Sequence, residues 1–328
     1  MTNFFIGFHH LEASPCYVNK ELLRFLTDKK YGYKTHYAGS GLKRRISTMW
    51  GILKAKRIIV SGIFLSKSEV RLMRLLRKKF IYLMHGSYTM ETGKIHPTEN
   101  LVRRYASKIV AVSRVHVEMI KNEFPQYADK VVEWFNGINW DDLDSDVAKL
   151  DMSRRDMKKI VLFGGGRHMK GNLQVCQAVQ QLNDEHGLNL HVDVYGEILD
   201  DDFSKEIAAI PCVNYIPLIP KNQINQELAK ANIFIANSKF DTFNLSVIEA
   251  LGLGCNVLFS KNVGAKDIIP AKDDTDIIYN VENIEEIKEK ILHLLSNPNN
   301  LRLKNSINRC ETAWQNRAEQ LALIASEN

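Results

Sequence analysis

Residues 238–260, SKFDTFNLSVIEALGLGCNVLFS, decide the fold, because a loop, a helix and a strand follow one another there without a gap. The apolar run 232–236 before this stretch has the length of a buried strand. Helical spacing of the apolar residues in 247–251 predicts a helix that stops at the two following glycines. The apolar run 255–259 predicts another strand. The order strand, loop, helix, strand predicts an α/β unit.

Two carboxylates frame this helix. Asp241 lies in the loop before it and Glu249 follows eight positions later, a turn or two into the helix. Unpaired backbone N–H groups of Phe243, Asn244 and Leu245 would begin the helix, and such an N-terminus can hold a phosphate without a cationic side chain. The loop therefore suits an anionic ligand that carries hydroxyl groups. The alternative is an Asp that only caps the helix and a Glu that is only solvated.

The segment resembles the E-x7-E signature of GT-B glycosyltransferases of the family 4 type, S-x-x-E-G-F-G-x-x-x-x-E-A-x-A-x-G-x-P-V. The matching positions are Ser238, Asp241, Phe243, Glu249, Ala250, Gly252 or Gly254, and Val257. Asp241 replaces the first Glu of the signature, and Thr242 and Asn244 replace its two glycines. The resemblance implies that the first acid contacts the donor sugar and that Glu249 binds the ribose. It also implies that the amides of residues 243–245 hold sugar and phosphate.

A second glycine-rich segment follows the apolar run 160–163, which predicts a strand. That strand leads directly into GGGRHMKGN, residues 164–172, where glycines let the backbone approach a phosphate and Arg167 and Lys170 add positive charge. It is not a Walker loop, because Lys170 is not followed by Ser or Thr, and it lacks dinucleotide-binding spacing. The resemblance implies that Gly166, Arg167 and Lys170 hold the donor diphosphate. A solvent-exposed loop without a ligand is the alternative.

Two further strands belong to the same half of the chain. Residues 190–195 predict a strand that ends at Glu197, and residues 213–216 predict another. We expect both strands to line the nucleobase side of the donor site. Glu197 is therefore a candidate donor-binding residue.

Histidines follow two predicted strands in the first half of the chain. The strand at 4–8 leads to His9 and His10, and the strand at 80–84 leads to His85. Ligands bind at the carboxyl ends of strands in open α/β sheets, so His9 and His10 are candidate acceptor contacts. Polar loop residues without a ligand are the alternative reading of all three. The resemblance implies that His85 approaches the donor sugar, which makes it a candidate catalytic residue beside Asp241.

Length and composition set the class of protein. A chain of 328 residues suits two domains, and its apolar and charged fractions are those of a soluble globular protein. Its five cysteines show no C-x-x-C spacing, which predicts reduced thiols and a cytoplasmic compartment. No apolar run approaches the roughly 18 residues of a membrane span, and the first ten residues do not resemble a secretion signal.

Charge differs between the two halves. Residues 1–150 carry 25 Lys and Arg against 14 Asp and Glu, a balance of +11, and the remainder carries 19 against 24, a balance of −5. A basic half suits nucleic acid, an anionic membrane or a phosphorylated substrate, and no nucleic-acid motif supports the first. Within residues 67–79, a helix would place Leu72, Leu75, Leu76 and Lys79 on one stripe with arginines around it. That segment either rests on an anionic bilayer or packs on its own domain as a solvated helix.

The polar stretch 140–158 has no strand pattern and predicts the interdomain linker. We expect an N-terminal Rossmann-like acceptor domain at 1–150 and a C-terminal Rossmann-like donor domain at 151–305. The GT-B resemblance implies that the two domains face each other across a cleft. It also implies that a terminal helix within 306–328 crosses back to the first domain.

The resemblance implies a retaining hexosyltransferase that moves a sugar from a nucleotide-diphosphate sugar, a UDP-sugar, to a saccharide acceptor. A lipid-linked acceptor at the inner membrane face would suit the basic half, in cell-surface polysaccharide or glycoconjugate synthesis. No metal or other cofactor is expected, since the sequence has no D-x-D near a strand end and no His/Cys cluster. One alternative is a catalytically silent GT-B subunit that binds or chaperones a partner glycosyltransferase or its protein substrate. A GT-B nucleotide-sugar epimerase is a further one.

Overall fold

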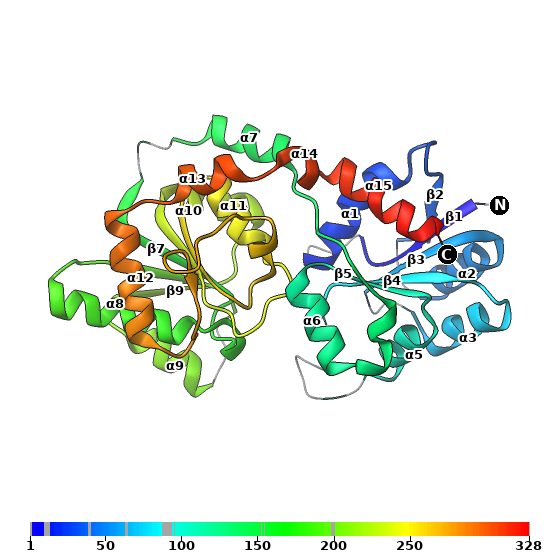
Figure 1. The fold of residues 1–328 in the computed structure, drawn as a ribbon, viewed down its shortest axis with the longest axis horizontal. Coiled ribbons are helices and arrows are strands. Elements are labelled where there is room, and N and C mark those ends of the chain that lie inside the picture. The colour runs from blue at the N-terminus through cyan, green and yellow to red at the C-terminus, as the bar shows by residue number, and fades with distance from the viewer. Residues whose placement is uncertain are drawn as a thin grey trace. The chain divides into compact units, whose positions relative to one another are not determined.

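The chain forms two compact α/β units in a computed structural model (Figure 1). Unit 1 comprises Met1–Ile138 with Arg309–Asn328, and unit 2 comprises Asn139–Asn308. The structure describes residues 2–9, 14–38, 41–62, 65–86, 94, 96–151, 153, 155–197 and 201–327.

Unit 1 is built on a six-stranded parallel sheet. Its strands in chain order are β1 (Thr2–Ile6), β2 (Tyr33–Thr35), β3 (Ala55–Ser61), β4 (Phe80–Met84), β5 (Lys108–Ala111) and β6 (Val131–Glu133). They lie side by side in the order β2-β1-β3-β4-β5-β6. The order reverses direction between β1 and β3, and such a switch point is where open α/β sheets bind ligands at their carboxyl edge.

Helices cover both faces of this sheet (Figure 1). One face packs on α2 (Gly41–Lys54), α3 (Lys67–Leu75), α5 (Pro97–Tyr105) and α6 (Arg114–Glu123), and the other carries α1 (Ser14–Leu26) and α15 (Trp314–Ser326). The shared core explains the apolar strands, since Phe4, Ile58 and Tyr82 are almost fully buried against the first group. The Ser113 side chain accepts a hydrogen bond from the backbone N–H of His116 and so caps α6.

Unit 2 repeats the doubly wound plan with a different strand order. Its strands are β7 (Asp156–Phe163), β8 (His191–Tyr195), β9 (Val213–Ile216), β10 (Ala231–Ala236), β11 (Asn256–Ser260) and β12 (Ile277–Ile278). All pairs are parallel in the order β12-β11-β10-β7-β8-β9. This is the Rossmann order, with its switch point between β7 and β10.

The helices of unit 2 also form two layers. One face packs on α8 (Asn172–His186), α9 (Asp202–Ala209) and α12 (Ile284–Ser296), and the other packs on α10 (Lys221–Lys230) and α11 (Leu245–Gly252). Helices α7 (Trp140–Lys149) and α13 (Asn300–Ser306) contact α11. The strand, helix and strand predicted within 232–259 are β10, α11 and β11, so that prediction is confirmed.

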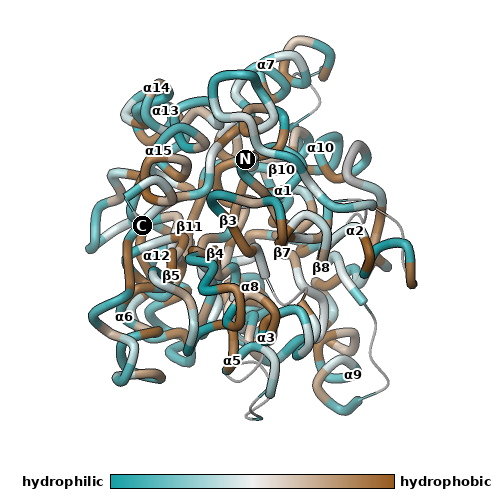
Figure 2. Tube along the Cα trace, turned by 90° about the vertical axis from the view of Figure 1, so that its right-hand side faces the viewer, coloured by the Kyte–Doolittle hydropathy of each residue, from teal (hydrophilic) through white to brown (hydrophobic). Residues whose placement is uncertain are grey.

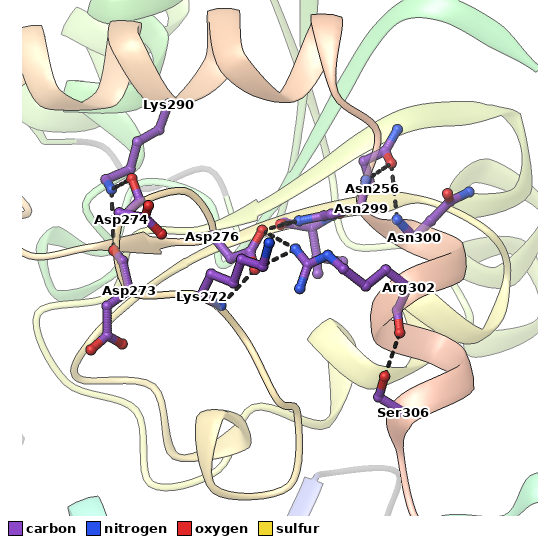
Figure 3. Close-up of polar contacts among 11 residues, drawn as sticks. Asn256, Lys272, Asp273, Asp274, Asp276, Lys290, Asn299, Asn300, Arg302 and Ser306 are labelled. Carbon is purple, nitrogen blue, oxygen red and sulfur yellow. Dashed lines mark hydrogen bonds and ion pairs between the residues drawn. The ribbon is translucent and has the colours of Figure 1, made fainter.

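A buried polar network fastens α13 to the edge of this sheet (Figure 3). Asp276 is 1 % exposed and accepts hydrogen bonds from Arg302 Nη2 at 2.7 and 2.8 Å and from Asn299 Nδ2 at 2.8 Å. The backbone N–H of Asn299 donates to Asn256 Oδ1 at 2.9 Å. These bonds give the buried carboxylate the partners that burial requires.

Three stretches differ from their predicted form. Residues 140–149 are helical rather than a linker, because Asn139 caps the helix and Trp140 and Leu143 are buried. The predicted terminal helix within 306–328 is also not one continuous helix. The chain there forms α14 (Arg309–Thr312) and α15, separated by the extended residue Ala313, which pairs with Ile138.

The predicted stripe in 67–79 is also wrong in part. Helix α3 ends at Leu75, so Leu76 and Lys79 are not on it, and Leu72 packs against the core. The apolar positions of α3 are therefore divided between the core and the surface. None of the helices in the described ranges has the length and apolar character needed to span a bilayer.

Candidate functional site

A glycine turn shapes the carboxyl end of β7. Gly164 has a φ of +103° and Gly165 a φ of +56°, both in the region that favours glycine. A Cβ on Gly164 would lie 2.6 Å from Lys170 Cγ. Lys170 is the last residue of the short 3-10 helix His168–Lys170, and its side chain passes over this turn. Glycine at position 164 leaves room for that side chain.

Lys170 meets Asp241 at the switch point of unit 2. Lys170 Nζ lies 2.6 Å from Asp241 Oδ2, with the two side chains only 23 % and 14 % exposed. The loop that carries Asp241 is held by its own backbone, which donates to Asn262 O at 3.1 Å and accepts from the Gly264 amide at 3.0 Å. The two charged groups therefore come from the ends of β7 and β10, which are neighbours in the sheet.

The same carboxylate organises the entrance of α11. Asn244 Nδ2 donates to Asp241 Oδ2 at 3.0 Å, and the Phe243 amide donates to Asp241 Oδ1 at 3.3 Å. Asn244 itself adopts a left-handed conformation with φ +62°, and the helix begins at Leu245. The expectation that the Phe243 N–H has no hydrogen-bond partner is therefore wrong. Its ring is 2 % exposed and packs in the core.

Glu249 lies one turn inside α11 and is half-buried. Its neighbours Ile248 and Ala250 are buried, which fixes the face of the helix on which Glu249 sits. The first turn of α11, starting at Leu245, has backbone N–H groups without partners in the helix ladder. This end of unit 2 thus combines a cation, the Asp241 carboxylate and a helix N-terminus, and Glu249 lies one turn into that helix.

The remaining predicted donor residues lie around the same strand ends. Arg167 is exposed, and its Nε donates to Gly164 O at 3.2 Å. Gly166 is buried beside Ser204. Glu197 follows β8 with an exposed side chain, and its backbone carbonyl accepts from the Tyr215 hydroxyl at 2.9 Å.

In unit 1, His85 belongs to a hydrogen-bonded chain at the ends of β3 and β4. His85 Nε2 lies 2.7 Å from Ser61 Oγ, and the Ser61 hydroxyl donates to Asn19 Oδ1. Asn19 Nδ2 donates to Phe8 O, which sets the orientation of that amide. Because the one Ser61 proton goes to Asn19, the proton between His85 and Ser61 belongs to His85 Nε2.

Burial sets the charge of His85. Desolvation lowers its pKa to about 4, so the ring is neutral at pH 7. A neutral imidazole can accept or donate a hydrogen bond, but it is not a cation that neutralises a phosphate. His85 can therefore orient a hydroxyl group at this end of the sheet.

His9 follows β1 and is half-buried. Its Nδ1 lies 3.1 Å from Gly7 O, and its ring lies 5.3 Å from the ring of His36. His36 is buried with Nε2 2.9 Å from the same carbonyl, and desolvation lowers its pKa. His10 lies outside the described residues.

Three of these side chains, Ser61, Asn19 and His36, were not predicted from the sequence. Ser61 is the last residue of β3, so the rule that ligands bind at carboxyl strand ends could have found it. Asn19 lies inside α1 and His36 directly follows β2, and neither has a distinctive neighbour in the sequence. Their roles depend on how the elements pack.

The two doubly wound units define the GT-B fold, and solved structures match them along the whole chain. HepE from Anabaena, in complex with UDP and glucose, has a TM-score of 0.69 at 14 % identity, with 100 % of both chains covered. A glycosyltransferase from Rickettsia africae has a TM-score of 0.72 at 15 % identity, covering 99 % of this chain and 98 % of that one. Sucrose-phosphate synthase from Thermosynechococcus elongatus has a TM-score of 0.69 at 14 % identity, covering 100 % and 99 %.

The family model described as Glycosyl transferases group 1 matches residues 149–310. The match takes in most of unit 2, including the glycine turn, Lys170, Asp241 and Glu249. A search of the curated proteins found no match. The fold of the whole chain is therefore that of GT-B glycosyltransferases, and its second unit matches the group 1 family.

Proposed function

We propose that the protein is a retaining glycosyltransferase of the family 4 type that uses a UDP-sugar. The observation that carries the proposal is the pairing of Lys170 with Asp241 at the switch point of unit 2, inside the segment that matches the group 1 model. The choice of UDP is supported by HepE, whose structures hold UDP or UDP-glucose. The activity is that of a hexosyltransferase.

Unit 2 binds the donor in this proposal. Lys170 and Arg167 neutralise the diphosphate, with the first-turn amides of α11 as further donors. Glu249 binds the ribose hydroxyls. When the bond between the anomeric carbon and the diphosphate breaks, negative charge grows on the leaving oxygen, and the same cations stabilise it. This arrangement is the reason to propose transfer without a metal ion.

Asp241 and the neutral His85 orient the donor sugar through its hydroxyl groups. Lys170 exchanges its contact with Asp241 for the diphosphate, which leaves the carboxylate ready to accept hydrogen bonds from the sugar. Asp241 therefore acts twice, first as the partner of Lys170 and then as a sugar ligand.

The proposed acceptor is a saccharide on a lipid carrier, with His9 and His10 among its contacts. The basic balance of residues 1–150 supports an anionic carrier and an anionic membrane surface. We therefore place the enzyme in the cytoplasm at the inner membrane face, in cell-surface polysaccharide or glycoconjugate synthesis.

Calorimetric titration with UDP and GDP tests the donor assignment. We expect UDP to bind, and Lys170→Ala and Glu249→Ala each to weaken it about tenfold or more, because each removes a charged hydrogen-bonding group. Lys158→Ala is the matched control, since this exposed lysine lies at the opposite end of β7. Binding of neither nucleotide would favour the silent-subunit alternative. NMR of the first product formed tests whether the transferred sugar keeps the anomeric configuration that it had in the donor.

A further inference from the structure

Helix α2 of unit 1 presents a stripe of large apolar side chains to solvent. Its exposed residues are Leu42 (71 %), Ile46 (58 %), Met49 (40 %), Trp50 (59 %) and Leu53 (47 %). They account for five of the fifteen exposed large apolar side chains in the described parts of the chain. Figure 2 shows the brown hydrophobic positions alternating with teal hydrophilic ones along α2. Such clustering marks an interaction surface rather than the scattered apolar exposure of an ordinary surface.

The stripe is not the face that attaches α2 to its own unit. That face carries the buried residues Thr48 and Ile52, and Gly51 packs directly on the Phe4 ring. At about 100° per residue, the exposed stripe covers roughly 100° of the helix on the side opposite these contacts. A helix on a globular core normally turns its wide apolar stripe inward. α2 therefore has one narrow face for the core and one wide apolar face without a described partner.

Positive charge surrounds this apolar face. Residues 41–79 hold twelve Lys and Arg against one acidic residue, Glu69. That residue is 1 % exposed and lies 3.8 Å from Arg44, so it contributes little negative charge to the surface. At helical spacing, Lys43 and Lys54 flank the stripe on one side and Arg45 flanks it on the other. Lys54 Nζ lies 4.3 Å from the centre of the Trp50 ring.

We propose that α2 is an in-plane docking helix that inserts its apolar stripe into an anionic lipid bilayer. Five apolar side chains favour the acyl boundary, and the flanking cations meet the lipid headgroups. Trp50 suits the interface between the two, and the lysine stems can extend to keep their charge in the headgroup layer. Nucleic acid would match the charge but would leave the apolar stripe exposed. The apolar stripe and the positive charge around it together select an anionic bilayer as the occupant.

This inference deepens the proposed function by naming the element that brings the protein to its lipid-linked acceptor. It assigns α2, where sequence reasoning pointed to residues 67–79. In α3 the apolar positions Val70 and Met73 are buried in the core. A bilayer would thus contact α2 first, with the cations of α3 adding to the charged surround.

Binding to vesicles tests the proposal on the full chain. Trp50 is the reporter, because the other tryptophans, Trp134, Trp140 and Trp314, are buried. We expect phosphatidylcholine vesicles containing phosphatidylglycerol to shift the Trp50 fluorescence to the blue. We also expect them to bind the protein at least about tenfold more tightly than phosphatidylcholine alone, because several cations meet the anionic surface. Added salt should weaken this binding.

The decisive variant is the double substitution Ile46→Gln with Leu53→Gln. It should lower vesicle affinity at least about tenfold, since it removes two large apolar side chains from the stripe. The matched control is Leu218→Gln with Leu301→Gln, two exposed leucines of unit 2, which should leave affinity within about twofold. All four positions are exposed, so melting temperatures should stay close to that of the unaltered protein.

Three results would overturn the docking proposal. They are binding to neither vesicle, equal loss in both double variants, and a soluble dimer that only the α2 variant dissociates while vesicles bind nothing. UDP titration on the same samples separates this test from the proposed function. Vesicle binding without UDP binding would refute the donor assignment alone, and UDP binding without vesicle binding would refute the docking helix alone.

Discussion

Lys170 Nζ and Asp241 Oδ2 form a close ion pair, 2.6 Å apart, at the strand ends where a donor diphosphate is proposed to bind. The ion pair holds the Lys170 ammonium beside the glycine turn. The Asp241 carboxylate competes with an incoming phosphate for that ammonium group. It therefore couples the two groups that the proposed donor would use separately.

Asp241→Asn should tighten binding of UDP while slowing sugar transfer. The substitution removes a charged competitor for Lys170, and a partly exposed ion pair of about 1 kcal/mol corresponds to about fivefold in affinity. Calorimetry with UDP measures the gain, and turnover of the UDP-sugar measures the loss. Weaker UDP binding in this variant would contradict the competition between carboxylate and phosphate.

Gly164→Ala should weaken UDP binding about as much as Lys170→Ala does. The new methyl group would lie 2.6 Å from Lys170 Cγ, and the φ of +103° is strained for alanine. The matched control is Gly187→Ala, which has a φ of +63° but no atom within 4 Å of the added methyl. That control should cost about 1 kcal/mol of stability and leave UDP affinity unchanged. Equal UDP loss in both variants would indicate a general destabilisation of unit 2.

Ser61→Ala should slow transfer about tenfold without changing UDP affinity. The substitution removes the acceptor for His85 Nε2–H, so the ring loses the contact that fixes its tautomer and orientation. Ser61→Thr, which keeps the hydroxyl, should retain more activity than the alanine variant. Ser61 is a positioning residue in this scheme. An unchanged UDP affinity would show that the substitution does not act through the donor-binding residues of unit 2. An unchanged turnover in Ser61→Ala would remove His85 from the proposed mechanism.

Stability should fall as the pH drops from 7 to 5, and His116 should account for part of the fall. Burial, with a smaller effect of His85, lowers the pKa of His116 to about 3, whereas an unfolded histidine titrates near 6.5. At pH 5 the unfolded chain therefore binds a proton at His116 that the folded chain does not bind. This difference lowers the free energy of unfolding by about 2 kcal/mol at pH 5.

His116→Asn tests this pH dependence by denaturant unfolding at the two pH values. Asparagine can still accept the Val112 amide hydrogen bond that His116 Nδ1 accepts at 3.2 Å. The variant should lose less stability than the unaltered protein between pH 7 and pH 5. His186→Asn, at an exposed position, should behave like the unaltered protein. If His116→Asn showed the full pH dependence, the proton uptake would belong to other groups.

Arg302→Gln should destabilise unit 2 by about 2 kcal/mol, because it leaves the buried Asp276 carboxylate without its cation (Figure 3). Burial favours a raised pKa for Asp276, but the hydrogen bonds from Arg302 and Asn299 outweigh it and lower the pKa. The stabilisation is therefore present above the unfolded pKa and lost as the pH falls through the lowered one. Thermal melts at pH 7 measure the cost, with Leu301→Gln as the neighbouring exposed control. Equal melting temperatures would show that Asp276 depends on its other partners.

Much of unit 2 could be predicted from sequence because its elements have strong local signals. Apolar runs bounded by polar or glycine residues marked β9, β10 and β11, and helical spacing marked α11. The contact between Lys170 and Asp241 was harder to predict from the sequence, because it joins residues at the ends of two different strands. Only the strand order β10-β7 brings those ends together.

Other features depend on packing that a local pattern does not encode. Residues 140–149 are polar enough to suggest a linker, yet two buried side chains, Trp140 and Leu143, are sufficient to attach α7. The chain from His85 through Ser61 to Asn19 joins two strand ends to the middle of a helix. The exposed stripe of α2 has helical spacing, and spacing alone does not tell whether such a stripe faces the core or the solvent.

The return of Arg309–Asn328 to unit 1 sets the order in which the molecule can be completed during synthesis. Helix α15 packs on α1, and the Trp134 indole donates to Arg317 O at 2.9 Å within the same unit. A ribosome makes every residue of unit 2 before it makes α15. Unit 1 is therefore completed only after all of unit 2 has been made, and the nascent chain carries an uncovered face of α1 until α15 emerges.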